Sequence, residues 1–186
     1  MNTSLYYYVK QYKNILDTQI CQQTITELEN TTFERHWYYD NIKKEKFTDD
    51  LDCYVSMADT TTSEYLKNAI INCVDAYQKE LGFSWFHNWE GIVRPRFNKY
   101  TVGTAMKKHC DHITTLFDGT RRGIPILSIL GCLQNSDSGG DLILFDDKIV
   151  NFMPGDIFIF PSNFLFPHRV TPVIAGTRYS FVSWLW

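Results

Sequence analysis

The chain has 186 residues, of which 44% are hydrophobic, 16% aromatic and 21% charged. This composition is typical of one globular domain with a sizeable core, and no window approaches the roughly 18 uninterrupted apolar residues of a membrane span. The formal net charge of −3 gives no general attraction to nucleic acid or to an acidic membrane, so neither is expected as a partner. Small basic groups are expected to be solvated or to make local substrate contacts: Arg94, Arg96 and Lys99, and Arg121 and Arg122.

The cysteines and the first residues predict a cytoplasmic protein. An odd number of cysteines at scattered spacings, without a CxxC pair, favours free thiols in a reducing compartment. They are Cys21, Cys53, Cys73, Cys110 and Cys132. The start, MNTSLYYYVKQYKN, has no cationic segment followed by an apolar core, so no signal peptide is expected. These features leave the oligomeric state open.

Up to about residue 90 the apolar residues recur mostly at helical spacing. A helix is expected after Asp17. Its buried side would carry Cys21, Ile25 and Leu28. The next stretch, WYYDNIKKEKFTDD at 37–50, is polar with aromatic insertions and predicts a loop that covers another part of the protein.

A second helix is expected over 61–82. Its apolar residues fall three or four apart and form one stripe: Leu66, Ile70, Val74, Tyr77 and Leu81. Thr61 and Glu64 have the spacing of a capping box, and Gly82 stands where a left-handed residue ends a helix. Cys73 falls on the buried side and is expected to be a core residue.

After residue 90 the pattern changes to short runs rich in β-branched and aromatic residues, separated by turns that carry Gly with Asp, Ser, Asn or Pro. Strands are expected over 92–100, 109–113, 125–133, 141–145, 148–152, 156–160, 168–171 and 178–186. Eight short strands without intervening helices predict a sandwich or barrel, of which the jelly roll is the eight-stranded version. The expected fold is mainly β, with N-terminal helices covering the outer face of one sheet. The chain is expected to be a single domain, with 1–90 as a helical support region and 91–186 as the β core.

Residues 109–112 read HCDH, and all four side chains can bind a metal. Side chains on an extended segment alternate between faces, so one ion could take His109 with Asp111 or Cys110 with His112. On this evidence alone, the histidine of such a pair is as compatible with a buried core residue as with a metal ligand. His36 and His87 have no partner at ligand spacing and are assigned no role.

His168 starts the predicted strand 168–171, and the strands between it and Asp111 can bring the two together in a jelly roll. Two histidines and one carboxylate form a facial triad, which holds three of the six positions around Fe(II). The three open positions suit a bidentate co-substrate and dioxygen.

Arg178 follows His168 by ten residues, and Ser180 shares its face of the last predicted strand. A guanidinium binds a carboxylate through two parallel hydrogen bonds, and a nearby hydroxyl can add a third. A buried arginine at a barrel mouth needs an anionic partner. The far carboxylate of a dicarboxylic keto acid would supply one.

Four motifs stand in order along the C-terminal half. They are YTVGTAMKKHCD at 100–111, SGGDLILF at 138–145, MPGDIFIFPS at 153–162 and HRVTPVIAGTRYSFVSW at 168–184. They resemble, in turn, Y-x-x-G…H-x-D, G-G-E/D-L…F, P-G-D…F-P-S and H-x-V-x-P-V-x-x-G-x-R of the iron- and 2-oxoglutarate-dependent oxygenases of the prolyl/lysyl hydroxylase type. The likeness covers roughly 92–186, and the four motifs in this order are highly specific. The first 90 residues resemble only the family's general helical lead-in.

The resemblance implies a double-stranded β-helix that binds Fe(II) and 2-oxoglutarate. The implied iron ligands are His109, Asp111 and His168. Arg178 would bind the distal carboxylate of 2-oxoglutarate, with Tyr100 and Ser180 as hydroxyl donors. Many prolyl 4-hydroxylases have lysine where this chain has Arg178, and arginine there is more like lysyl hydroxylases and bacterial relatives.

The activity implied is hydroxylation of an unactivated C–H bond, with O2 consumed, 2-oxoglutarate decarboxylated to succinate and ascorbate as a candidate reductant. The expected substrate is a peptidyl proline or lysine; a free amino acid or a nucleobase methyl group are alternatives. The partner is thus a peptide, a protein or a small-molecule substrate. Two other functions stay open: a cupin-like metal enzyme that uses no keto acid, and a non-catalytic metal-binding scaffold.

Overall fold

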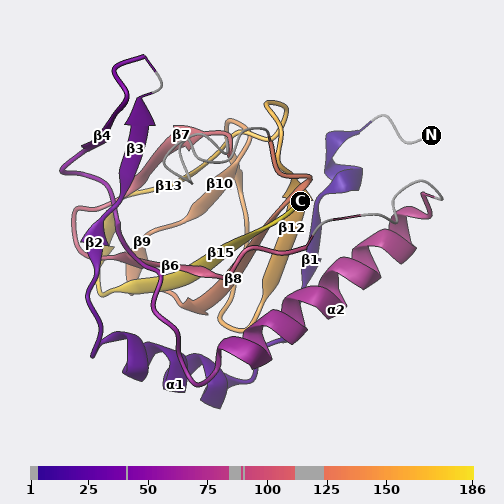
Figure 1. Cartoon of the computed structure of the whole chain (residues 1–186), viewed down its shortest axis with the longest axis horizontal. Helices are drawn as coiled ribbons and strands as arrows, with labels where there is room; N and C mark the ends of the chain where they lie inside the picture. The colour runs from indigo at the N-terminus through magenta and orange to yellow at the C-terminus, as the bar shows by residue number, and fades with distance from the viewer. Residues whose placement is uncertain (1–3, 41, 84–88, 90, 112–123) are drawn as a thin grey trace.

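Figure 1 shows the computed structural model of the chain, which describes residues 4–40, 42–83, 89, 91–111 and 124–186. Two β-sheets form the centre, and two α-helices lie along one side of the larger sheet. This arrangement confirms the predicted fold class, mainly β with N-terminal helices.

Seven strands form the larger sheet, and every adjacent pair is antiparallel. Their order is β1 (Lys10–Tyr12), β12 (Ile157–Pro161), β8 (Leu127–Gln134), β15 (Arg178–Leu185), β6 (Arg96–Tyr100), β5 (Tyr54–Ser56) and β2 (Glu34–Arg35). Because β8 and β15 lie at the middle of this order, each is paired on both sides, and their side chains are almost all buried.

The smaller sheet has four strands, in the order β11 (Lys148–Ile149), β10 (Leu142–Leu144), β13 (His168–Val170) and β7 (Met106–His109). Two short pairs complete the β structure: β14 (Val173–Ala175) with β9 (Ser138–Gly139), and β3 (Trp37–Asp40) with β4 (Glu45–Thr48). A short 3-10 helix, η1 (Leu5–Tyr8), precedes β1.

Two expectations for the β structure are wrong. Residues 37–40 and 45–48 pair as the β3–β4 hairpin instead of forming a loop. Tyr38 lies opposite Phe47, and the two rings stack with their centroids 5.3 Å apart, which stabilises the pairing. The strand expected over 109–113 is β7, which ends at His109. The predicted positions from 112 to 123 lie outside the described residues.

The N-terminal part is more than a pair of helices. It also supplies β1, β2 and β5 to the larger sheet, where β1 pairs with β12 and β5 pairs with β6. The backbone hydrogen bonds of the sheet therefore cross the boundary expected near residue 90. The division of one domain into 1–90 and 91–186 stays a prediction.

Both predicted helices are confirmed. Helix α1 (Thr18–Leu28) begins after Asp17, whose carboxylate accepts a hydrogen bond from the Gln19 backbone N–H at 2.7 Å. Helix α2 (Ser63–Leu81) ends at Gly82, which has the left-handed φ of 64° that a glycine adopts without a steric cost.

The capping box expected at Thr61 and Glu64 is wrong. Helix α2 begins two residues after Thr61, and its N-cap, Thr62, makes no side-chain capping bond. The Thr61 backbone N–H instead donates to Glu27 of α1 at 2.7 Å, and the Thr61 hydroxyl bonds the same carboxylate. Tertiary contact between the helices therefore takes the groups that a local cap would use.

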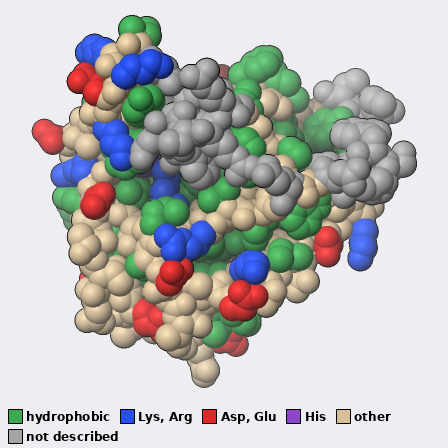
Figure 2. All heavy atoms as spheres, viewed as in Figure 1, with side chains coloured by type: hydrophobic (Ala, Val, Ile, Leu, Met, Phe, Trp, Pro, Cys, Tyr) green, Lys and Arg blue, Asp and Glu red, His purple; other side chains and the backbone are tan. Residues whose placement is uncertain are grey.

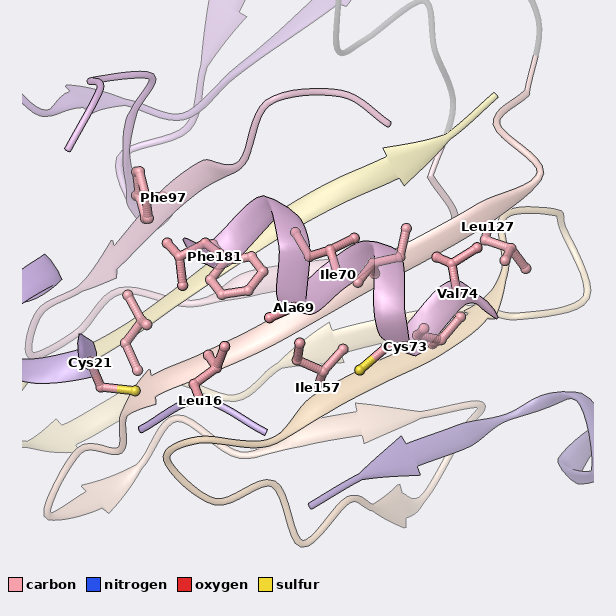
Figure 3. Close-up of a cluster of buried hydrophobic side chains, with 14 of the residues drawn as sticks. Leu16, Cys21, Ala69, Ile70, Cys73, Val74, Phe97, Leu127, Ile157 and Phe181 are labelled. Carbon is pink, nitrogen blue, oxygen red and sulfur yellow. The ribbon is translucent and has the colours of Figure 1, made fainter. Parts of the chain in front are cut away.

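The apolar stripe of α2 packs against the larger sheet (Figure 3). Ile70 and Val74, both fully buried, lie over Ile157 and Phe181 of β12 and β15. The helix thereby covers the outer face of the sheet, as its sequence pattern predicts, and the other face of the sheet is left to face the smaller sheet.

Gly131 in β8 makes room for the ring of Phe181, its partner on β15. A Cβ at position 131 would lie 2.0 Å from Cζ of the ring, which is fully buried. We expect Gly131→Ala to lower the free energy of unfolding by about 3 kcal/mol, because the overpacked ring has no free space to enter. Urea unfolding measures the loss. Adding Phe181→Leu should give a double variant that loses less than the sum of the single losses; strictly additive losses would contradict the clash.

Strand β6 separates its side chains between the two faces of the larger sheet. Phe97 packs under the helices, and Lys99 pairs with the end of α1. The alternate residues Arg96, Asn98 and Tyr100 line a cavity between the two sheets. This alternation places polar groups inside the barrel, while the opposite face carries Phe97 in the core and Lys99 at its edge.

Among the described residues, no helix is long and apolar enough to cross a bilayer. On the face drawn in Figure 2, Lys and Arg side chains are interspersed with Asp and Glu side chains. Neither sign of charge forms a continuous patch there, in keeping with the small net charge of the chain.

Candidate metal centre

The structure brings His109, Asp111 and His168 together at one side of the cavity. One nitrogen or oxygen atom from each residue lies within 4.8 Å of the others, and no other group of three potential ligands forms among the described residues. Strands β7 and β13 are neighbours in the smaller sheet, and His109 stands directly opposite His168 in their register. Sheet pairing, not sequence proximity, therefore joins the two imidazoles.

Each imidazole is oriented by the backbone carbonyl two residues before it in the chain. Nδ1 of His109 lies 2.7 Å from the Lys107 carbonyl oxygen, and Nδ1 of His168 lies 3.2 Å from that of Phe166. A carbonyl can only accept, so each Nδ1 carries the hydrogen and each Nε2 keeps a free lone pair. The Nε2 atoms are 3.5 and 3.8 Å from Oδ1 of Asp111. Three lone-pair atoms thus converge on one point.

Asp111 is held by two residues of the larger sheet. Its Oδ2 accepts hydrogen bonds from the Ser128 hydroxyl at 2.6 Å and from the Trp184 indole N–H at 3.0 Å. Ser128 is in turn within 2.5 Å of the Ser162 hydroxyl. These bonds occupy Oδ2 and leave Oδ1 directed at the imidazoles, the arrangement in which outer partners orient a metal-binding carboxylate.

The pKa shifts of Asp111 and His168 favour the protonation states that bind a cation. Burial raises the pKa of Asp111, but His168, His109 and the Ser128 hydroxyl outweigh it and hold the pKa well below its usual range. Burial and the neighbouring His109 lower the pKa of His168 to about 4. Burial also lowers the pKa of His109, but Asp111 outweighs it and the pKa is raised. An ionised carboxylate and a neutral imidazole are the forms that bind a metal.

Arg178 lies deep in the same cavity and is only 3% exposed. Its Nη1 donates to Oδ1 of Asn135 at 3.2 Å and lies 3.7 Å from the Cys132 sulfur, whereas its Nε is buried without a hydrogen-bond partner. Among the described residues no carboxylate pairs with it. The guanidinium therefore keeps unused donors in a site where an unpaired buried charge is costly.

Glycine at position 140 allows the chain to pass close to Arg178. Gly140 has φ +71°, and a Cβ there would lie 3.3 Å from Cδ of Arg178 and 2.7 Å from the Ser136 hydroxyl. A side chain at this position would push against the guanidinium stem. The second glycine of SGGD thus has a packing reason.

Tyr100 and Ser180 line the cavity together with Arg178. Tyr100 stands opposite Arg178 in the register of β6 and β15, and its ring centroid is 5.9 Å from the guanidinium carbon. Burial, then the neighbouring Cys53 thiol, raise the pKa of Tyr100 well above its ordinary value, so its hydroxyl is protonated and can donate. Ser180 is 6% exposed and lies two residues along from Arg178 on the same strand.

The residues present fit a divalent metal and an anionic co-substrate. Two imidazoles and one carboxylate form the donor set that favours Fe(II) with open positions. The unpartnered Nε of Arg178 is the observation that fits a carboxylate. The cavity measures about 40 Å³, enough for about three water molecules, and Arg178 also lines a second cavity of about 310 Å³.

The structure describes one member of the alternative pair of ligands, Cys110. Cys110 is half-buried and stands outside the cluster, and His112 lies outside the described residues. Arg121, Arg122 and His87 lie outside them too. Sequence reasoning missed Ser128, Asn135 and the bond from Trp184, because nothing in the spacing of these residues marks them as partners of Asp111 and Arg178.

His36, which has no assigned role, is buried beside Asp52, with Nδ1 3.9 Å from Oδ2. Burial lowers its pKa from 6.5 to about 4, although Asp52 opposes the shift. Between pH 6.5 and 4, His36 is protonated in the unfolded chain but not in the folded one. The stability contributed by the neutral His36 is therefore fully present above pH 6.5 and is lost as the pH falls toward 4. For this group the loss is up to roughly 3 kcal/mol.

The measurement is urea unfolding of metal-free protein at several pH values between 7 and 4. We expect His36→Gln to have a flatter pH dependence than the wild type, with the remaining slope supplied by other groups such as His168. Equal slopes for both proteins would contradict the assignment.

Residues 95–186 match the family model of the 2OG-Fe(II) oxygenase superfamily. A PKHD-type hydroxylase of Delftia acidovorans is 31% identical over 99 residues, which cover 50% of this chain and 43% of that protein. Another, of Teredinibacter turnerae, is 33% identical over 101 residues, which cover 52% of this chain and 44% of that protein. The chain therefore matches less than half of the length of these relatives.

Solved structures of prolyl hydroxylases share the fold. The prolyl hydroxylase of Trichoplax adhaerens, solved with a peptide of a hypoxia inducible factor, aligns with a TM-score of 0.68 at 18% identity, over 97% of this chain and 84% of that one. The prolyl-4-hydroxylase of Pseudomonas putida gives 0.65 at 18%, over 96% and 91%. The viral collagen prolyl hydroxylase of Paramecium Bursaria Chlorella virus-1, in its 2OG complex, gives 0.68 at 11%, over 96% and 95%. This likeness confirms the predicted jelly roll.

Proposed function

We propose that this protein is an Fe(II)- and 2-oxoglutarate-dependent dioxygenase that hydroxylates an unactivated C–H bond, a proposal supported by the match of residues 95–186 to the model of the 2OG-Fe(II) oxygenase superfamily. The observation that carries the proposal is the shared cavity. Nε2 of His109, Oδ1 of Asp111 and Nε2 of His168 converge at one side of it, and the unpaired Nε of Arg178 lies in its wall.

The residues would have distinct roles. His109, Asp111 and His168 would hold Fe(II), and Arg178 would bind the distal carboxylate of 2-oxoglutarate with Tyr100 and Ser180 as hydroxyl donors. When bound, iron and 2-oxoglutarate supply the activation of O2 for hydroxylation, with succinate and carbon dioxide as the co-products. The proposed site residues are therefore the same six that the sequence predicts.

The protein's own residues orient the metal ligands and enclose the metal centre. The Lys107 and Phe166 carbonyls fix the tautomers of the two imidazoles, and Ser128 with Trp184 fixes the carboxylate. Buried aromatic and aliphatic residues of both sheets exclude water from the centre. No protein group is required to move a proton to or from the carbon that reacts, so the absence of an acid–base pair from the assigned residues agrees with this chemistry.

The substrate we propose is a peptidyl proline or lysine. Support comes from the PKHD-type hydroxylases among the relatives and from the peptide bound to the Trichoplax enzyme of the same fold. The arginine at position 178 supports a site closer to lysyl hydroxylases and bacterial relatives than to prolyl 4-hydroxylases with lysine there. The free cysteines support a cytoplasmic location, and residues 1–90 would serve as the support region of a single domain.

Two other functions have less support. A cupin-like metal enzyme that uses no keto acid would have no use for a buried arginine with unfilled donors next to the metal ligands. A non-catalytic scaffold would not need the three ligands to be intact together with that arginine. Both alternatives predict that 2-oxoglutarate does not bind.

The test is turnover of 2-oxoglutarate. Iron-loaded protein is incubated with 2-oxoglutarate, ascorbate and O2, and succinate is followed with and without a peptide library. We expect slow succinate release alone, faster release with the library, and a peptide product that is heavier by one oxygen atom in mass spectrometry. Metal binding with no succinate under any of these conditions would sink the proposal.

A further inference from the structure

Arg96 is a second cation at the cavity, and the proposed chemistry does not use it. It starts β6 and shares with Asn98 and Tyr100 the face that lines the cavity. Its guanidinium carbon lies 5.3 Å from the ring centroid of Trp184, the residue that holds Asp111. Arg96 therefore stands one side chain away from the metal centre.

The polar atoms around Arg96 are incompletely satisfied. Its Nε is buried without a hydrogen-bond partner, and so is Oδ1 of the neighbouring Asn98. In the described part of the chain no carboxylate forms an ion pair with Arg96. By contrast, the exposed Arg94, two residues earlier, forms an ion pair with Asp59 at 2.9 Å. An arginine with a buried, unfilled donor beside a cavity is suited to an anion that comes from outside the chain.

Arg96 also forms the inner wall of an outer cavity of about 430 Å³. The other walls come from the segment 31–37, which includes His36 and Trp37, and from residues 55–58. This lining also holds one carboxylate, that of Glu34, whose side chain is exposed. Nδ1 of His36 is another buried atom without a hydrogen-bond partner. Arg96 thus lies between the cavity of the metal centre and a larger one, and a group bound in the outer cavity would reach toward the metal past this side chain.

The anion is not the co-substrate. In the register of β6 and β15, Arg178 lies opposite Tyr100 and Arg96 lies opposite Val182. Four residues of strand separate the two positions, about 13 Å at the usual rise per residue. A five-carbon diacid spans only roughly 5 Å between its terminal carbons. Arg178 is directed at Asn135 and Cys132, and Arg96 at Trp184, so the two guanidinium groups serve different ends of the cavity.

We propose that the outer cavity is the substrate subsite and that Arg96 binds a carboxylate of the substrate, next to the carbon that is hydroxylated. The preferred substrate is then a peptide or amino acid with an acidic side chain or a free C-terminal carboxylate beside the target. The proposal rests on the proposed function, since it places the substrate relative to the same metal centre. Trp37 and His36 supply an apolar ring and a polar atom in the wall of this subsite.

The test uses the whole chain loaded with Mn(II), with and without 2-oxoglutarate, and three pools of acetylated tetrapeptides. One pool has a single Asp or Glu and an amidated C-terminus, one has a free C-terminus and no acidic side chain, and one has Asn or Gln and an amidated C-terminus. Equilibrium dialysis with mass spectrometry measures what is retained. We expect one or both carboxylate pools to bind about 10- to 100-fold more tightly than the neutral pool, as a charge-assisted hydrogen-bond pair provides. Comparing the pool with an acidic side chain and the pool with a free C-terminus shows which of these two carboxylates is bound.

The variants separate the role of Arg96 from general effects. Arg96→Gln should abolish the preference for carboxylate, Arg96→Lys should restore much of it, and the matched Arg94→Gln should leave it unchanged. Calorimetry of 2-oxoglutarate binding to Arg96→Gln should give an affinity within about twofold of the wild type, since Arg96 does not contact 2-oxoglutarate in this proposal. Matching urea midpoints establish that the variants are folded.

Equal retention of all three pools by the wild type, including retention of none, would overturn the proposal. A loss of 2-oxoglutarate affinity in Arg96→Gln as large as in Arg178→Ala would overturn it too, because Arg96 would then serve the co-substrate. Failure of the proposed function has a different result: the wild type would neither bind 2-oxoglutarate nor form succinate, whatever the pools do in the arm without 2-oxoglutarate.

Discussion

Asp111→Ala is expected to weaken Mn(II) or Fe(II) binding by at least about 100-fold and to abolish succinate formation. Asp111 is the only carboxylate of the cluster and supplies its only negative charge. Without it two imidazoles would remain, and one of them, His168, has its pKa lowered by burial and is neutral. A site of two imidazoles gives a divalent cation neither charge compensation nor a third ligand.

Calorimetric titration of metal-free protein with Mn(II) measures the loss without relying on turnover. Asp111→Asn keeps a side chain of the same shape that can still accept from Ser128 and Trp184, so it separates loss of charge from loss of packing. Asp75→Ala, at an exposed position of α2, is the matched control and should bind metal as the wild type does. Wild-type affinity in Asp111→Ala would remove this residue from the ligand set.

Arg178→Ala is expected to weaken 2-oxoglutarate binding by about 100-fold while metal affinity changes by no more than about twofold. The guanidinium has a buried donor with no partner, and in the described residues no carboxylate neutralises it. It does not belong to the metal cluster. Its removal therefore takes away the anchor for the distal carboxylate and leaves the ligands and their outer hydrogen bonds in place.

Separate titrations with Mn(II) and then with 2-oxoglutarate give the two affinities. Arg178→Lys keeps the charge but not the two parallel donors, and it should bind 2-oxoglutarate more tightly than Arg178→Ala and less tightly than the wild type. If Arg178→Ala lost metal and 2-oxoglutarate affinity equally, the residue would be acting on the whole site and not as an anchor for the co-substrate.

Local chemistry made several features predictable. The stripe of α2 and its stop at Gly82 follow from helical spacing and from the left-handed conformation that glycine adopts. The alternation of side chains on an extended segment singles out His109 with Asp111 or Cys110 with His112, and the motif HRVTPVIAGTR adds His168 and Arg178. These signals span a few residues each, so they survive in the sequence without knowledge of the fold.

Local chemistry also misled where tertiary contacts compete for the same groups. Thr61 has the spacing of a capping residue, yet Glu27 of the other helix accepts hydrogen bonds from both its backbone N–H and its hydroxyl. The polar stretch after Trp37 pairs with itself because Tyr38 and Phe47 stack across the turn. In both cases the deciding partner lies beyond the window in which a pattern can be recognised.

By itself the sequence determined the types of element, the candidate ligands and the arginine ten residues beyond the last of them, because each depends on spacing along one strand, one helix or one turn. Only the tertiary structure decided which of these meet. His168 faces His109 because β13 and β7 pair in one register, and Asp111 is held by Ser128 and Trp184, which are 17 and 73 residues away. Arg96 and its outer cavity likewise come from the packing of separate segments. Such contacts are set by strand register and sheet packing, which carry no signature in the spacing of the residues concerned.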